Sequence, residues 1–121
     1  MNKTTTKIPS GNYSCYVRGV RVVYEPTIRI ELSLEIGAGE YKDYFNDNEV
    51  PLFDHEEALS LSFSPLSYVD NNLFIRVIRM FEDGNPGFRF VSHESLLNKN
   101  IQVVFDGRIK KLLPVSNNHG Q

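Results

Sequence analysis

The clearest hydrophobic pattern in the chain is a strict alternation over residues 28–36. Apolar side chains (Ile28, Ile30, Leu32, Leu34, Ile36) alternate with polar ones (Arg29, Glu31, Ser33, Glu35). Successive side chains of a β-strand point to opposite faces, so this pattern predicts a strand with one buried and one solvated face. We expect the polar set, Glu35 included, on the solvated face.

Residues 13–24 also alternate, but the phase of the alternation changes midway. The inward candidates are Tyr13, Cys15 and Val17 before Gly19, and Val20, Val22 and Tyr24 after it. A slip of one residue moves every later side chain to the other face. We therefore expect a long first strand with a bulge or kink at Gly19, where the lack of a Cβ tolerates it.

The remaining elements follow from turn residues and spacing. A glycine-rich turn after residue 36 leads to a third strand expected over residues 41–45, with Tyr41 and Phe45 inward. Apolar residues at helical spacing predict a helix over residues 71–83 with Asp70 as its N-cap. A fourth strand over residues 101–105 and a two-residue Asp-Gly turn lead to a fifth strand over residues 108–115.

This element order predicts an all-β fold with one helix. Three strands, a helix and two more strands, with the first strand bent, are typical of a five-stranded barrel of the OB-fold type, in which the helix lies between strands 3 and 4. The chain of 121 residues is expected to form one such domain over residues 1–121, with flexible ends at 1–8 and 116–121.

Charge is unevenly distributed along the chain. The formal net charge is only -2, which argues against a globally basic protein that binds duplex DNA. Residues 46–72 contain no Lys or Arg and all of the following acids: Asp47, Glu49, Asp54, Glu56, Glu57 and Asp70. We expect this segment to be a long, mobile acidic loop, which leaves the remaining surface mildly basic.

Catalytic and metal-binding patterns are missing from the sequence. His55, His93 and His119 are scattered and have no partner at metal-ligand spacing. There is no glycine-rich phosphate loop, and no nucleophile has a paired base. We therefore expect no enzyme activity, no cofactor and no metal. One cysteine, with neither a signal peptide nor an apolar run that could cross a bilayer, favours a soluble cytoplasmic protein without a membrane partner.

Cations and one tyrosine occupy outward positions of the first three expected strands. They are Arg18 and Arg21 on the first strand, Arg29 on the second, and Lys42 with Tyr44 on the third, while Arg108 and Lys110 could extend the same surface. Single-stranded nucleic acid binds to cations that follow its phosphates and to aromatics that stack its bases. The alternative is that Arg and Glu on this face form cross-strand ion pairs.

The sequence also resembles a known group of proteins. The motifs are Ile8-Pro-Ser-Gly-Asn-Tyr13, Tyr16-Val-Arg-Gly-Val20, Ile30-Glu-Leu-Ser-Leu-Glu-Ile36, Gly39-Glu-Tyr-Lys-Asp-Tyr-Phe45, Asn85-Pro-Gly-Phe88 and Leu96-Leu-Asn-Lys-Asn-Ile-Gln-Val-Val-Phe105. They are similar to small proteins of phages and conjugative elements of Gram-positive bacteria, which in turn resemble phage single-stranded-DNA-binding proteins. This resemblance implies a barrel, single-stranded DNA as partner, and a role in DNA replication or recombination.

Two functions from different classes remain after the sequence analysis. The first is binding of single-stranded nucleic acid, most simply DNA, in a mobile element. The second is a protein-interaction or structural module that uses the barrel face or the acidic 46–72 segment. The sequence leaves the protein partner and homo-oligomer formation open.

Overall fold

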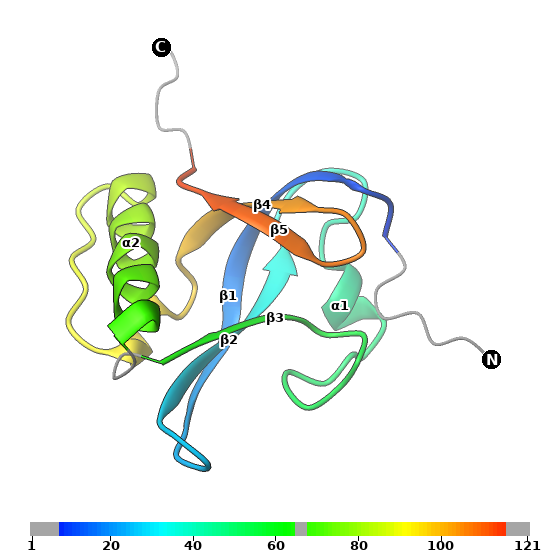
Figure 1. Cartoon of the computed structure of the whole chain (residues 1–121). Coiled ribbons are helices and arrows are strands. Elements are labelled where there is room, and N and C mark those ends of the chain that lie inside the picture. The colour runs from blue at the N-terminus through cyan, green and yellow to red at the C-terminus, as the bar shows by residue number, and fades with distance from the viewer. Residues whose placement is uncertain (1–7, 65–67, 116–121) are drawn as a thin grey trace.

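The structure, a computed structural model, describes residues 8–64 and 68–115, with side chains for 8–64 and 73–115. Five antiparallel strands form one sheet in the order β3-β2-β1-β4-β5, curled into a half-barrel (Figure 1). The strands are β1 (Gly11–Val23), β2 (Arg29–Ile36), β3 (Leu59–Phe63), β4 (Asn100–Phe105) and β5 (Ile109–Leu113). The helices are α1 (Tyr44–Asp47), α2 (Tyr68–Gly84) and the short 3-10 helix η1 (His93–Leu96).

β1 has the irregularity expected at Gly19. Val17 pairs with Leu34 and Gly19 pairs with Ser33, so Arg18 is an extra residue in β1 and forms a bulge. The first part of β1 pairs with β4 and the second part with β2, which curls the sheet. The predicted change of face is confirmed for Cys15 and Val17, both buried, and for Val20 and Val22, which pack against the core. Tyr24 is the exception: it lies beyond the strand and is 66% exposed.

The third strand was predicted in the wrong place. Residues 41–45 form a turn and the start of α1 instead of a strand. Asp43, just before α1, has a φ of 64°, a left-handed conformation that interrupts an extended chain. The strand that pairs with β2 is Leu59–Phe63, within the segment expected to be an acidic loop. Apolar Leu59, Leu61 and Phe63 alternate there with serines, so at least this part of the segment is an integral layer of the sheet.

The predicted helix after the third strand is confirmed. α2 begins at Tyr68, earlier than expected, so Asp70 lies inside the helix instead of capping it. Val77 and Phe81 are buried, and α2 packs against β3, β4 and β5. Figure 1 shows α2 standing beside the end of β5. No described helix is long and apolar enough to cross a membrane.

The hairpin between β4 and β5 is confirmed, but its loop has three residues instead of two. Phe105 pairs with Ile109, and the Asp106 N–H donates to the Arg108 carbonyl oxygen at 2.9 Å. Gly107 has a φ of 76°, the left-handed position that such a loop requires. Ile8, expected in a flexible terminus, is 5% exposed and belongs to the core; residues 1–7 and 116–121 lie outside the described residues.

Candidate nucleic-acid interface

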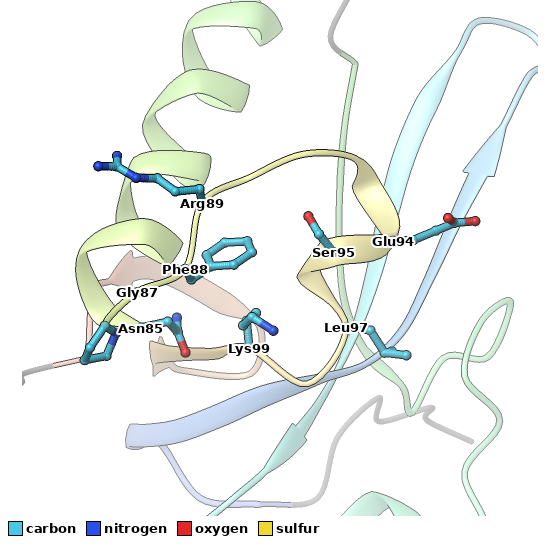
Figure 2. A pocket seen from close by; sticks show the side chains of 9 residues that line it. Asn85, Gly87, Phe88, Arg89, Glu94, Ser95, Leu97 and Lys99 are labelled. Atoms are coloured by element: carbon cyan, nitrogen blue, oxygen red, sulfur yellow. The ribbon is translucent and has the colours of Figure 1, made fainter.

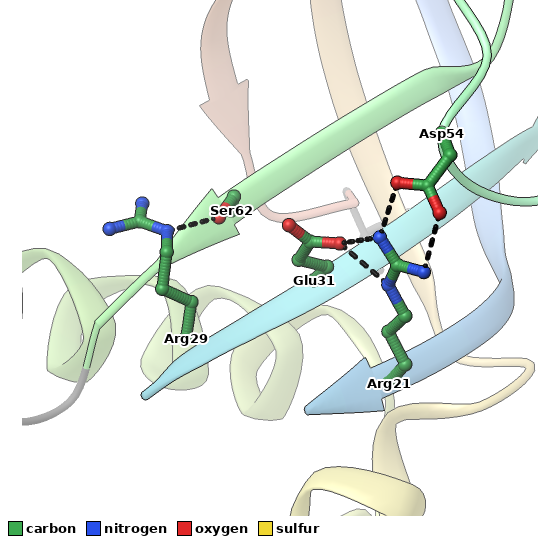
Figure 3. Close-up of polar contacts among 5 residues, drawn as sticks. All are labelled: Arg21, Arg29, Glu31, Asp54 and Ser62. Carbon is green, nitrogen blue, oxygen red and sulfur yellow. Dashed lines mark hydrogen bonds and ion pairs between the residues drawn. The ribbon is translucent and has the colours of Figure 1, made fainter. Parts of the chain in front are cut away.

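Arg21 is held in an ion-pair network on the outer face of β1 and β2. Its guanidinium contacts the Glu31 carboxylate at 2.7 Å and both oxygens of the Asp54 carboxylate at 2.7 and 2.9 Å (Figure 3). It also lies 4.5 Å from the centroid of the Phe53 ring. The hydrogen bond to Arg21 lowers the pKa of Asp54. The alternative of cross-strand ion pairing is therefore realised here, with Arg21 directly opposite Glu31.

Arg18, the bulged residue, holds the chain that follows α1. Its guanidinium donates to the Val50 and Pro51 carbonyl oxygens at 3.0 and 3.1 Å and to the Asn46 side chain at 3.1 Å. Its Nε donates to the Ser33 hydroxyl at 3.2 Å. These contacts use four of the five N–H donors of the guanidinium, which leaves one for a phosphate.

Arg29 and Tyr44 are also engaged within the fold. Arg29 Nε donates to the Ser62 hydroxyl of β3 at 2.7 Å. Tyr44, expected to point outward from a strand, lies in α1 with its ring half-buried between Tyr41 and Phe45, at centroid distances of 6.2 and 5.1 Å. Lys42 is exposed, but it lies in the turn before α1 and not on a strand.

The two candidates near the C-terminus, Arg108 and Lys110, belong to the β4–β5 hairpin. Arg108 is exposed in the β4–β5 loop and lines a cavity of about 180 Å³ with residues of β3. Lys110 is exposed on β5, which β1 and β4 separate from β2 in the strand order. Arg108 thus lies near β3, whereas Lys110 lies on a strand that does not pair with β2.

Glu35, also expected on the solvated face, is fully buried. Its carboxylate accepts the backbone N–H groups of Ile36, Phe45 and Asn46 at 2.9, 3.0 and 2.6 Å. The last two belong to the first turn of α1, whose amides have no partner within the helix. Glu35 is therefore a buried polar residue in an otherwise alternating strand, and its carboxylate supplies the acceptor that the N–H groups of α1 need.

A groove that the sequence analysis did not assign lies where α2 ends. It has a volume of about 770 Å³ and is lined by Asn85, Pro86, Gly87, Phe88, Arg89, Glu94, Ser95, Leu97 and Lys99. Figure 2 shows the Phe88 ring between the chain that leaves α2 and the chain that enters β4, with Lys99 beside it. The Lys99 ammonium lies 5.0 Å from the ring centroid, within the range of a cation–π contact.

The walls of this groove are held by Asn85, which is 7% exposed. Its Nδ2 donates to the Phe81 carbonyl at 2.7 Å and to the Asn100 carbonyl at 2.9 Å. Its Oδ1 accepts the Asn100 N–H at 2.9 Å. The amide thus connects the last turn of α2 to the first residue of β4. Gly87 follows with a φ of 83°, which turns the chain back so that Phe88 faces Lys99.

The groove lies in the more basic half of the described chain. Residues 8–64 carry ten Asp and Glu residues and four Lys and Arg residues, whereas residues 68–115 carry seven Lys and Arg residues and five Asp and Glu residues. Arg89 is exposed and Lys99 half-buried, and neither has an ion-pair partner among the described side chains, 8–64 and 73–115. The sequence does contain a signal for this site: an aromatic residue and a cation, Phe88 and Arg89, directly follow the turn sequence Asn-Pro-Gly, outside the periodic pattern of the helix.

Comparisons with known proteins add no assignment. No protein-family model, no curated protein and no solved structure matches the chain.

Proposed function

We propose that the protein binds single-stranded nucleic acid in the groove lined by Phe88, Arg89 and Lys99. The observation that carries the proposal is the Phe88 ring, half-buried in an open groove with the Lys99 ammonium over it. A base stacked on an aromatic ring contributes about 1–3 kcal/mol, and neighbouring cations neutralise the phosphates on either side. The groove offers both kinds of contact, with Phe88 and Arg89 on one wall and Lys99 on the other.

The fixed geometry of the groove supports this assignment. The three hydrogen bonds of Asn85 keep the two walls at a set separation before any ligand arrives. A preformed site loses less side-chain and loop freedom on binding than a flexible one. The Arg21 network on the outer face of β1 and β2 would instead have to break its carboxylate contacts to bind a phosphate. We therefore place the proposed interface at the end of α2 and not on the outer face of β1 and β2.

We further propose that the half-barrel is of the OB-fold type. A bent β1 that pairs with both β2 and β4, and a helix between β3 and β4, support this assignment. The resemblance of the sequence motifs to small phage and conjugative-element proteins, which are similar to phage single-stranded-DNA-binding proteins, favours DNA as the ligand and replication or recombination in a mobile element as the setting.

Titration of a fluorescent 20-base oligodeoxythymidine at two salt concentrations tests the proposal. We expect saturable binding that weakens as salt rises, because phosphate contacts release counterions. Lys99→Gln should lower the slope of log affinity against log salt by about 0.7, the value for one phosphate contact on a single strand. Lys42→Gln, an exposed cation outside the groove, is the matched control and should leave the slope unchanged. Equal slopes for wild type and Lys99→Gln, or no binding, would overturn the assignment.

A further inference from the structure

A second groove lies between α2 and β5 and shares no lining residue with the first. It has a volume of about 440 Å³, and its walls are mainly apolar: Leu73, Val77 and Met80 from α2, and Ile109 and Leu112 from β5. Three cations complete its lining: Arg76, Lys110 and Lys111. The groove therefore combines an apolar floor with a basic rim.

The positive charge of the rim has no negative partner among the residues that line the groove. Arg76, Lys110 and Lys111 are all exposed, and no acid lines the groove. Among the side chains that the structure describes, those of residues 8–64 and 73–115, none of the three has an ion-pair partner. This contrasts with Arg21 on β1, whose charge is matched inside the fold. A negatively charged occupant would supply the missing partners.

A bulge places the two lysines side by side at this edge. Val104 pairs with Lys111 and the next residue, Phe105, pairs with Ile109, so Lys110 is an extra residue in β5. A regular strand would send neighbouring side chains to opposite faces, whereas a bulge redirects one of them. Both lysines consequently line the same groove.

β5 is also the last strand of the sheet. In the order β3-β2-β1-β4-β5 it pairs with β4 alone, so one edge of its backbone has no strand partner among the described residues. Such an edge can accept an additional strand, and a groove between an edge strand and a helix is the setting for this mode of peptide recognition. Lysines on the edge disfavour pairing with a second copy of β5, since like charges would face one another.

We propose that the groove between α2 and β5 binds an extended acidic segment of a partner protein, which adds a strand to the edge of β5. Backbone hydrogen bonds to β5 hold the segment, and its alternate apolar side chains rest on the floor formed by Val77, Met80 and Leu112. Its carboxylates reach Arg76, Lys110 and Lys111. The site is separate from the proposed nucleic-acid groove, so each can be tested without the other.

The probe is a fluorescein-labelled seven-residue peptide of alternating glutamate and valine, titrated into the full chain by fluorescence anisotropy. The test variant is Lys110→Glu/Lys111→Glu. The matched control, Lys42→Glu/Arg79→Glu, makes the same charge change at exposed residues that do not line the groove. We expect the test variant to weaken binding about tenfold, because each exposed ion pair contributes up to about fivefold, and the control to bind as the wild type does.

Two further measurements make the result decisive. A peptide with N-methyl groups at alternate backbone nitrogens should lose most of its affinity, since it cannot pair with a strand. Amide exchange of residues 109–113 should slow when the unmodified peptide binds. If the lysine variant does not fold, as judged by its thermal melting, Arg76→Glu on the surface of α2 replaces it, with Arg79→Glu as control.

The proposal is overturned by any of four results: no binding of the peptide, equal loss in test and control variants, equal affinity of the N-methylated peptide, or unchanged amide exchange in β5. It is also overturned if the 20-base oligonucleotide displaces the peptide and the same lysine variant weakens the oligonucleotide. That result would assign this groove to nucleic acid instead of to a protein.

Discussion

The carboxylate of Glu35 accepts the backbone N–H of Asn46 at a distance of 2.6 Å. Glu35 is fully buried in β2, and Asn46 lies in α1, eleven positions further along the chain. Because the same carboxylate also accepts the Phe45 N–H, it joins the end of β2 to the helix that follows. This contact holds the first turn of α1 against the end of β2.

Glu35→Gln should destabilise the fold by about 2–3 kcal/mol. The amide has a single acceptor oxygen and two N–H groups, which would face the N–H groups of α1 without an acceptor. Urea unfolding measures the loss. Glu31→Gln is the matched control on the same strand, and its partly exposed pair with Arg21 should cost less than about 1 kcal/mol. Equal effects of the two changes would contradict the structural role given to Glu35.

Gly84→Ala should destabilise the fold by about 1–3 kcal/mol, although alanine is the better helix residue. A Cβ at this position would lie 2.7 Å from the backbone nitrogen of Val115. A backbone atom cannot move aside by a rotamer change, so the clash would have to shift the chain. Gly19→Ala is the comparison. Its Cβ would meet only the end of the Leu52 side chain at 3.0 Å, and Leu52 is 41% exposed and able to move. A melting temperature for Gly84→Ala at or above the wild-type value would refute the close approach.

Alkaline pH should reveal the burial of Cys15. Desolvation, followed by the charge of Glu35, raises the pKa of the Cys15 thiol from 9.0 to about 12. As the pH rises, the thiol ionises in the unfolded chain before it ionises in the folded one. The free energy of unfolding therefore falls between pH 9 and pH 12, by up to about 1.4 kcal/mol per pH unit. Urea unfolding at pH 8 and pH 10 should show a smaller loss for Cys15→Ala than for the wild type. Identical losses would mean that the thiol is accessible.

Phe88→Leu should weaken oligonucleotide binding by about 1–3 kcal/mol while keeping most of the apolar volume at this position. The affinity should fall without a change in the salt slope, since no phosphate contact is removed. Phe88→Tyr, which keeps the ring, is the control and should bind as the wild type does. A loss of melting temperature with normal affinity would mean that Phe88 serves packing alone.

The bend in β1 and the alternation of β2 were predictable because both depend on local periodicity. The third strand was not. Tyr41 and Phe45 have the spacing of inward strand residues, but Asp43 between them has a left-handed φ of 64°. The Glu35 carboxylate then accepts N–H groups of α1, a long-range contact that hydrophobic spacing does not reveal. A buried carboxylate in an otherwise regular strand has no signature in hydrophobic periodicity.

The candidate site was less predictable than the fold. Outward positions on β1 and β2 do carry cations, but Arg21 meets Asp54, a residue 33 positions away, in a segment that was expected to be a loop. Whether an arginine is available to a ligand depends on such long-range partners. Phe88 lies in an irregular segment, where no periodicity separates a core aromatic from a binding one.

The most direct test of the nucleic-acid interface is an amide chemical-shift titration of the full chain with a ten-base oligodeoxythymidine. We expect the largest shifts on residues 85–89 and 94–99, whose side chains include those that line the groove around Phe88. The backbone around Arg21 and Glu31, whose side chains pair with each other, should change little. Shifts concentrated on β1 and β2, or none anywhere at saturating oligonucleotide, would contradict it.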